Sequence, residues 1–298
     1  MSTIGIVTVL YNSETVLRDF FLSLNSQTYK DFTLYVIDNA SKDEGLKLAK
    51  ELAQKASFRC VIIPEEENWG IAKGNNIGIK VALNDGCKYV LLSNNDVVLN
   101  HTNTIEILLK KIESLGADII CPKIYYHHDP NLIWAAGGDY KFFDTATVHF
   151  GSLEKDNGQF NKEQIIRYTP TCFTLIKNSV FDEIGLMDED YFVYYDDTDF
   201  MYRAWKHHLK IIYTPETSIL HNESVSTGKN SSFRICQLVR NQFYFVRKNR
   251  TLLTFIILLL YRLAVFTKHL FTHPASLNKD EFKAICEGIS SPLYVTKK

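Results

Sequence analysis

The stretch TIGIVTVLYNSETVLRDFFLSLNSQTYKDFTLYVIDNA, residues 3–40, decides the fold class of this chain. Residues 3–10 are apolar and mostly β-branched, which is typical of a strand buried on both faces of a sheet. A helix is predicted next, behind Ser13 as its cap, because apolar residues recur at helical spacing: Val16, Leu17, Phe20, Phe21 and Leu24. Residues 32–37 predict a second strand, parallel to the first because a helix joins the two.

The same alternation continues along the chain. We predict a helix over 43–56, a strand over 59–63, a helix over 71–83 and a strand over 89–92. Four strands joined through helices predict a parallel, doubly wound sheet, in which ligands bind at the carboxyl ends of the strands. Further strands are expected over 118–122 and 171–177 and helices over 179–184 and 196–207, while the irregular residues 125–168 are expected to shape a substrate site.

Charge is unevenly distributed along the 298 residues. The formal net charge of −1 favours neither nucleic acid nor a membrane as a partner. Residues 1–221, however, carry 21 Lys and Arg against 30 Asp and Glu, a net of −9, whereas residues 222–298 carry 12 against 4, a net of +8. The sequence therefore predicts an acidic body with a basic tail, which becomes helical from residue 231.

Cysteine spacing and apolar runs bear on the cellular compartment. Six cysteines without a CxxC pair, and the lack of a signal sequence before Thr3, predict reduced thiols in the cytoplasm. The longest apolar run, Leu252 to Tyr261, has ten residues, whereas a helix needs roughly 20 to cross a bilayer, so we expect no span. Two roles for the tail stay open: an interfacial helix on an anionic inner leaflet, or a face buried against the catalytic domain or a second subunit.

Polar residues follow each of the first four predicted strands. They are Tyr11 and Asn12, Asp38 and Asn39, Asn68 to Gly70, and Asn94 to Asp96. Because the carboxyl ends of parallel strands share one edge of the sheet, these residues predict a polar cleft large enough for a nucleotide. The alternative is that Asn and Asp serve there as ordinary turn and cap residues.

One carboxylate and one imidazole are placed to share a divalent ion. Asp96 ends the apolar strand YVLLSNND, and His221 directly follows the apolar stretch TSIL. Mg²⁺ or Mn²⁺ on a diphosphate takes one or two protein carboxylates, and Mn²⁺ also accepts imidazole. We therefore predict a Mn²⁺ or Mg²⁺ site at Asp96 and His221, with a polar strand cap as the other reading of His221.

Three carboxylates crowd the start of the last helix of the body. Asp196, Asp197 and Asp199 lie within four residues and repel one another, which raises the proton affinity of at least one and suits a general base. The helix dipole also favours negative charge at this end, so capping accounts for one of the three.

The motifs, taken in order, resemble those of the family 2 inverting glycosyltransferases of the GT-A fold, in the group of bacterial rhamnosyltransferases and galactofuranosyltransferases. The matching stretches are IVTVLYNSETVLRDFFLSLNSQ, VIDNASKD, NWGIAKGNNIGI, LLSNNDVVL, WAAGG, FDEIGLMDEDYFVYYDDTDFMYRAW, ILHNESVS and RNQFYFVRKN. The resemblance implies an α/β GT-A fold, with a Rossmann-like, mixed but mostly parallel sheet flanked by helices. It implies a catalytic domain over 1–230, with a nucleotide-binding half over 1–100 and an acceptor-binding half over 101–230, and a helical extension over 231–298.

The resemblance also assigns roles to residues of this sequence. Asp38 would read the nucleotide base, and the donor-binding set would comprise Thr8, Tyr11, Asp38, Asn68, Asn75, Asn94 and Asn95. Asn94-Asn95-Asp96 stands at the family's DxD position, with Asp96 as the metal ligand. Asp197 would be the catalytic base and Asp196 an acceptor contact. The implied donor is a UDP- or dTDP-sugar, with dTDP-rhamnose included. The implied acceptor is a glycan or lipid-linked glycan of bacterial surface polysaccharide synthesis.

Two rival functions are separable by sequence or by assay. A nucleotide-dependent dehydrogenase would carry GxGxxG after the first strand, where this chain has Asn-Ser-Glu. A catalytically degenerate homologue that only binds nucleotide sugar is suggested by Asn94, which stands where relatives often have an acid. Release of nucleoside diphosphate distinguishes an enzyme from a binder.

Overall fold

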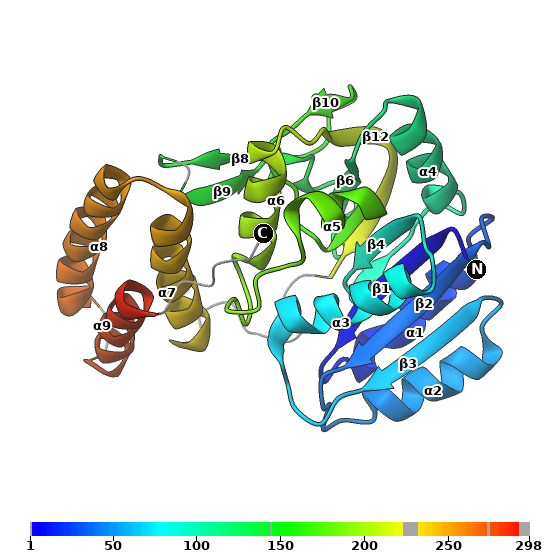
Figure 1. The fold of residues 1–298 in the computed structure, drawn as a ribbon, viewed down its shortest axis with the longest axis horizontal. Coiled ribbons are helices and arrows are strands. Elements are labelled where there is room, and N and C mark those ends of the chain that lie inside the picture. Colours follow the sequence, from blue (N-terminus) through cyan, green and yellow to red (C-terminus); the bar gives the residue numbers. More distant parts are fainter. Residues whose placement is uncertain (1, 144, 223–231, 273–274, 292–298) are drawn as a thin grey trace.

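The computed structural model describes residues 2–143, 145–222, 232–272 and 275–291 (Figure 1). Its centre is a mixed sheet in the order β10-β12-β6-β11-β4-β1-β2-β3, with β5 beside β12 and β7 beside β6. The predicted strands of the first half are β1 (Ile4–Leu10), β2 (Phe32–Asp38), β3 (Arg59–Pro64) and β4 (Tyr89–Ser93). Their pairs β1·β2, β2·β3 and β1·β4 are all parallel, as the alternating pattern predicts.

The second half of the sheet is where the strand direction changes. Strand β11 (Phe173–Lys177) lies antiparallel between β4 and β6 (Ile119–Tyr126). Beyond β6, the long strand β12 (Ile211–His221) is parallel to it, and the short strand β10 (Gln164–Ile165) runs antiparallel along β12 at the edge. The sheet is therefore mixed but mostly parallel.

Helices cover both faces of the sheet, because neighbouring strand residues point to opposite sides. Ile4, Ile6 and Leu10 of β1 pack in one cluster with α1 (Glu14–Asn25), α2 (Gly45–Lys55) and α4 (Thr104–Ser114). Val7 packs in the opposite cluster with α3 (Gly70–Asn84), α5 (Asn178–Ile184) and α6 (Asp196–Lys206). The result is the three-layer arrangement in Figure 1.

The predicted cap of α1 is wrong in its detail. The hydroxyl of Ser13 donates to the backbone oxygen of Tyr11, 3.1 Å away. The helix start is met by another segment instead, since Oδ2 of Asp43 accepts the N–H of Glu14 at 2.9 Å. An acid that is distant in the sequence thus accepts a hydrogen bond from a free N–H at the start of α1, and its negative charge is favourable at the positive end of the helix dipole.

The irregular residues 125–168 contain short strands. These are β7 (Ile133–Ala135), β8 (Gly138–Lys141), β9 (Ala146–His149) and β10; β5 (Val97–Val98) is equally short. The pair β8·β9 forms a separate antiparallel hairpin, which points toward the C-terminal helices in Figure 1.

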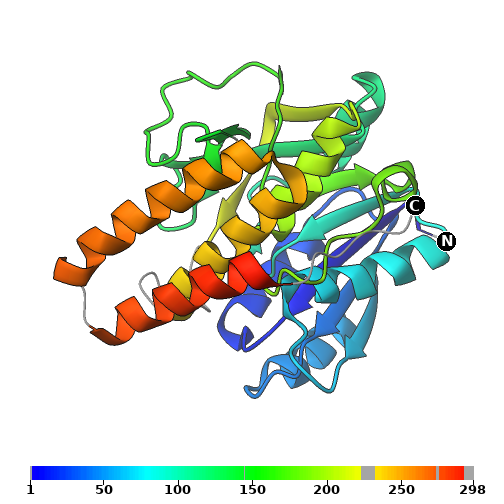
Figure 2. The same ribbon diagram turned by 60° about the vertical axis from the view of Figure 1, so that its left-hand side comes forward.

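Three helices follow the sheet: α7 (Ser232–Asn249), α8 (Leu252–Thr272) and α9 (Ala275–Ser290). Phe243, Tyr244 and Phe245 of α7 are fully buried in the cluster that contains α6, so α7 is part of the core. Helix α8 lies outermost (Figures 1 and 2).

The apolar element of the tail is longer than the sequence predicted. Helix α8 continues through Arg262, because Nε of Arg262 donates to Oε1 of Gln242 on α7 at 2.9 Å. Its 21 residues have a mean hydropathy of 1.6, so by length and composition α8 reaches what a membrane-crossing helix needs. All six cysteines are free thiols, as expected.

Candidate active site

Strand pairing brings Asp96 and His221 together. His221 at the end of β12 is opposite Val97 of β5, which directly follows Asp96. Nε2 of His221 lies 3.3 Å from Oδ1 of Asp96, and the N–H of Asn222 donates to the backbone oxygen of Asp96 at 2.9 Å. The two predicted ligands, far apart in sequence, thus meet at one edge of the sheet.

These two residues fit a divalent cation. Within the described residues, Oδ1 of Asp96 and Nδ1 of His221 are buried atoms without a well-directed hydrogen bond. Buried polar atoms are normally satisfied, so such atoms mark a place where a further group binds. The described part of the chain holds no cluster of three or more acidic, His or Cys side chains for a metal. An ion held here would therefore take its remaining ligands from the donor diphosphate and water.

A second group of unsatisfied atoms lies at the ends of β1 and β2. Thr8 is fully buried and Asp38 is 2% exposed, and the strand register places Thr8 beside Val36 and Leu10 beside Asp38. Within the part of the chain that the structure describes, Oγ1 of Thr8 and Oδ1 of Asp38 are buried with no hydrogen-bond partner. These atoms are placed to receive a ligand's polar groups.

The other predicted donor contacts divide into two kinds. Asn68 and Asn95 already bond to the backbone: Oδ1 of Asn68 accepts from Gly70 N–H at 3.0 Å, and Nδ2 of Asn95 donates to Val9 O at 2.8 Å. These two amides agree with the alternative interpretation of the strand-end residues, in which Asn and Asp stabilise turns and hold neighbouring strands together. Asn94 is exposed, Tyr11 is partly exposed, and the amide of Asn75 lies 3.7 Å from the Met187 sulfur, so their polar groups are less constrained.

The first turn of α3 touches the loop before α6. Gly70 has φ +79°, and a Cβ there would lie 2.2 Å from the backbone oxygen of Phe192, so no larger residue fits. The N–H of Ile71 donates to that same oxygen at 2.7 Å. Residues next to the candidate nucleotide pocket thus fix the loop that leads to the acidic cluster.

The three acids of α6 have different environments. Asp199 is fully buried and meets Arg203 Nε at 2.9 Å, Lys248 Nζ at 3.0 Å and Asn249 Nδ2 at 2.8 Å. Burial alone would raise the pKa of Asp199, but the charges of Arg203 and Lys248 outweigh it and hold that pKa below its ordinary value. Asp199 is therefore an ionised structural residue.

Asp196 and Asp197 form a close carboxyl pair. Burial, and then the charge of Asp197, raise the pKa of Asp196 to about 8. Burial also raises the pKa of Asp197, but Tyr168 and Thr198 oppose the rise by donating to its oxygens. The Tyr168 hydroxyl lies 2.7 Å from Oδ2, and the Thr198 N–H lies 2.6 Å from Oδ1. Because side-chain donors gather on Asp197, the carboxyl whose pKa is raised more strongly is that of Asp196.

A line of aromatic rings joins the Asp96 side of the site to Asp197. Trp134 packs edge-on against His221 at 4.5 Å between ring centroids and against His149 at 4.4 Å. His149 stacks on Tyr168 at 5.8 Å, and Tyr168 donates to Asp197. Burial lowers the pKa of His149 to about 4, so this ring is neutral. In the sequence, Trp134 stands out only within the motif WAAGG, and no signal marks His149 or Tyr168.

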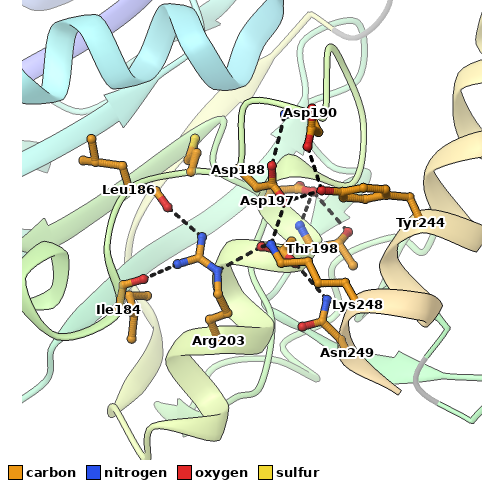
Figure 3. A network of polar contacts seen from close by, with 12 residues as sticks. Ile184, Leu186, Asp188, Asp190, Asp197, Thr198, Arg203, Tyr244, Lys248 and Asn249 are labelled. Atoms are coloured by element: carbon orange, nitrogen blue, oxygen red, sulfur yellow. Dashed lines mark hydrogen bonds and ion pairs between the residues drawn. The ribbon is translucent and has the colours of Figure 1, made fainter. Parts of the chain in front are cut away.

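Helix α7 supplies contacts that sequence reasoning missed. Lys248 Nζ bonds Asp188 at 2.6 Å as well as Asp199, and the Tyr244 hydroxyl bonds Asp188 and Asp190 at 3.1 and 2.9 Å (Figure 3). On the other side of this network, Nη2 of Arg203 donates to Leu186 O at 2.8 Å. The stretch RNQFYFVRKN contains the α7 residues, so the signal was present without an assigned role.

Asn241 holds the backbone just before the acidic pair. Its fully buried amide donates to the backbone oxygens of Val193 and Tyr194, both at 2.9 Å. Tyr194 and Tyr195 have φ values of 64° and 67°, a left-handed conformation that costs non-glycine residues energy. Asn241 therefore stabilises the strained turn from which Asp196 and Asp197 project.

The fold and this arrangement of residues match a known family. The family model described as "Glycosyl transferase family 2" matches residues 5–185, more than half of the chain. The chain belongs to glycosyl transferase family 2.

Curated relatives of this glycosyltransferase are distant but cover most of its length. It is 25% identical over 246 residues to the low-salt glycan biosynthesis hexosyltransferase Agl10 of Haloferax volcanii, covering 82% of this chain and 75% of the relative. It is also 25% identical over 256 residues to the dTDP-rhamnosyl transferase RfbF of Shigella flexneri, covering 83% and 81%.

Solved structures show the same GT-A fold. TarS 1–349 of S. aureus in complex with UDP-GlcNAc matches with a TM-score of 0.64 at 14% identity, over 97% of this glycosyltransferase and 80% of that chain. In the longer TarS structure the match covers 40% of that chain. The mannosyltransferase PcManGT of Pyrobaculum calidifontis, in complex with GDP-Man and Mn²⁺, matches with a TM-score of 0.58 at 12% identity. The match covers 98% of this glycosyltransferase and 76% of that chain.

Proposed function

We propose that this family 2 glycosyltransferase moves a sugar from a nucleotide diphosphate sugar to an acceptor hydroxyl, with inversion at the anomeric carbon and Asp197 as the base. The observation that carries the proposal is the asymmetry of the acidic pair. Asp197 accepts hydrogen bonds from Tyr168 and Thr198, while Asp196 lies buried with a raised pKa. Of the two carboxyl groups, Asp197 is therefore the one that ionises more readily, and an ionised carboxylate can accept a proton.

The proton transfer then follows from the residues present. Asp197 removes the proton of the acceptor hydroxyl as its oxygen bonds to the anomeric carbon and the bond to the diphosphate breaks. Attack from the face opposite the leaving group inverts the configuration. Asp196 stays protonated next to Asp197 and contacts the acceptor.

Asp96 and His221 are the residues that would hold Mn²⁺ or Mg²⁺. The 3.3 Å between Oδ1 of Asp96 and Nε2 of His221, and the burial of Oδ1 without a well-directed hydrogen bond, support this assignment. When bound, such an ion neutralises the charge that develops on the diphosphate leaving group. Thr8 and Asp38 are proposed to bind the nucleoside, with Tyr11, Asn75 and Asn94 beside them. Asn68 and Asn95 would shape this pocket through their backbone bonds.

The donor is proposed to be a UDP- or dTDP-sugar, with dTDP-rhamnose as the first to test. The Shigella relative is a dTDP-rhamnosyl transferase, which supports this choice. A further relative is the N-acetylglucosaminyl-diphospho-decaprenol L-rhamnosyltransferase of Mycobacterium tuberculosis, 29% identical over 72 residues and matching 24% of each chain. The name of this relative supports a lipid-linked acceptor. We propose further that the acceptor is a glycan or lipid-linked glycan of surface polysaccharide synthesis and that transfer takes place at the cytoplasmic face of a membrane.

The proposed division of labour places nucleotide binding in residues 1–100, acceptor binding in 101–230 and a supporting role in the extension 231–298. The burial of α7 against α6 supports an extension that acts on the site, since Asn241, Lys248 and Asn249 all contact residues around the acidic pair.

Release of nucleoside diphosphate tests the proposal. UDP- and dTDP-sugars are first screened with Mn²⁺ for thermal stabilisation, because a ligand of the folded state raises its stability. The stabilising donor is then mixed with candidate acceptors, and released nucleoside diphosphate is measured for the wild type and Asp197→Asn. We expect turnover in the wild type and a loss of several orders of magnitude in the variant, with donor binding retained.

Two results would contradict the proposal in different ways. Donor binding without any release in the wild type would identify a degenerate nucleotide-sugar binder. Near-normal turnover in Asp197→Asn would move the base elsewhere, to Asp196 first.

A further inference from the structure

Helix α8 presents a continuous apolar stripe on the outside of the molecule. The stripe consists of Leu253, Ile256, Leu260, Leu263 and Leu270, spaced by three, four or seven residues so that they share one helix face. Leu253 is 66% exposed and Leu260 is 62% exposed, while Thr254 and Leu258 are the buried residues of α8. Only 11% of the most apolar 18-residue window is buried. Apolar surface of this length marks an interaction site.

The tip of the β8–β9 hairpin extends this surface. Phe142 and Phe143 are exposed there, Phe143 to 60%, and the Phe142 ring lies 4.7 Å from Tyr261 of α8. Both phenylalanines have positive φ values, 53° and 55°, which cost energy in a residue with a Cβ. Two segments distant in the sequence thus place exposed aromatic side chains next to each other, beside the stripe.

Helix α8 is held flat against the protein along its whole length. Phe255 near its start packs on Phe243 of α7 at 6.0 Å between ring centroids, and Arg262 in the middle bonds Gln242. Near its end, Nδ1 of His269 lies 2.7 Å from Oε2 of Glu281 on α9. To cross a bilayer, α8 would have to give up all three contacts. The geometry therefore favours a helix whose inner side stays on the protein and whose outer stripe meets the partner.

Charge distinguishes an anionic lipid surface from a second copy of the chain. Exposed Lys268 on α8 and exposed Lys279 on α9 carry positive charge, and α8 has no acidic residue, while Arg262 and His269 are already paired with Gln242 and Glu281. Glu281, the acid nearest His269, is 1% exposed and faces inward. Two copies meeting through this face would bring these lysines together, whereas anionic headgroups attract each of them.

We propose that the apolar stripe of α8 and the Phe142-Phe143 tip together dock on an anionic bilayer, with α8 parallel to the membrane plane. The apolar side chains enter the boundary between headgroups and acyl chains, and the basic residues stay among the headgroups. This surface is separate from the acidic pair, so the proposal goes beyond the proposed sugar transfer and does not depend on which sugar is transferred.

Vesicle binding of the full-length protein tests the proposal. The protein is sedimented with vesicles of phosphatidylglycerol and phosphatidylcholine, or of phosphatidylcholine alone, at low and high salt. The test variant is Leu260→Glu, and its matched control is Leu22→Glu, because Leu22 on α1 is 64% exposed on a different part of the molecule. We expect binding to anionic vesicles at low salt, weakened by salt, and at least a tenfold lower partition coefficient for Leu260→Glu alone.

The remaining outcomes overturn the proposal. Equal binding to neutral vesicles, no binding to anionic vesicles, or equal binding of both leucine variants rejects the anionic lipid surface. Binding that survives alkaline carbonate extraction means that α8 spans the bilayer. A dimer in analytical ultracentrifugation that Leu260→Glu converts to a monomer, without vesicle binding, assigns the stripe to a second copy. Nucleoside diphosphate release is measured on the same samples; its absence in the wild type contradicts the proposed function and leaves the membrane result unaffected.

Discussion

Replacing Asp196 by Asn is expected to make the folded protein more stable at neutral and alkaline pH. Asp196 is 5% exposed, and burial followed by the charge of Asp197 raises its pKa from 3.8 to about 8. In the unfolded chain it titrates near its ordinary value. Between the two pKa values the folded state binds one more proton, so the free energy of unfolding falls as pH rises.

The size of the effect follows from the shift. A difference of about 4 pKa units, at 1.36 kcal/mol per unit, corresponds to about 5 kcal/mol in all. Below about pH 4 Asp196 is protonated in both states, and its stabilising contribution is fully present; above about pH 8 that contribution is lost. Asn does not titrate, so its advantage over Asp should grow by about 1.4 kcal/mol per pH unit, or about 4 kcal/mol from pH 5 to pH 8.

Urea unfolding followed by tryptophan fluorescence at pH 5, 6, 7 and 8 measures this gap. Asp199→Asn is the matched control, because Asp199 is buried on the same helix with its pKa lowered. A group whose pKa is lowered by folding stabilises the folded state at pH values above its unfolded-state pKa, and this contribution is lost in acid. Asp199→Asn should therefore lower the free energy of unfolding at pH 7 by about 3 kcal/mol. This cost should shrink toward low pH.

As pH rises, the difference in free energy of unfolding between variant and wild type must therefore change in opposite directions for the two variants. A gap between Asp196→Asn and the wild type that is constant or shrinks as pH rises would mean that Asp196 is ionised at neutral pH. In that case the proton is not held on Asp196, and the two carboxyl groups do not differ in the way that leaves Asp197 free to act as the base.

Three other perturbations probe the site. Asp96→Ala and His221→Ala should each weaken Mn²⁺-dependent donor binding by at least tenfold in calorimetry, because each removes one predicted ligand; unchanged affinity in both variants would reject the metal site. Asn241→Ala should lower kcat and shift the pH profile of activity, with little change in the KM for the donor, because it releases the turn before the acidic pair. Asn241→Gln should restore part of the activity. If the pH profile of Asn241→Ala equals that of the wild type, Asn241 does not position the acidic pair. Lys248→Met should cost about 3–5 kcal/mol in urea unfolding at pH 7, because Asp188 and Asp199 lose a buried cation; a cost below 1 kcal/mol would show that Arg203 and Asn249 suffice for Asp199.

Local sequence pattern was sufficient for most of the fold. The period of the apolar residues predicted β1 to β4 and α1 to α3 to within a few residues, because each of these elements buries a regular face. The strands within residues 125–168 could not be predicted in this way. They are as short as two residues, and their positions are determined by the strands they pair with rather than by their own periodicity.

The sequence by itself determined the alternating α/β order, the polar residues at the strand ends, and the candidate residues Asp96, Asp197 and His221. These depend on local periodicity and on motifs that stand close together in the chain. Tertiary structure alone decided which acid does what. Lys248 and Asn249 reach α6 from α7, so Asp199 is paired, whereas Tyr168 from the segment before β11 donates to Asp197. Protonation depends on burial and on charges in space, and neither can be read from spacing along the chain.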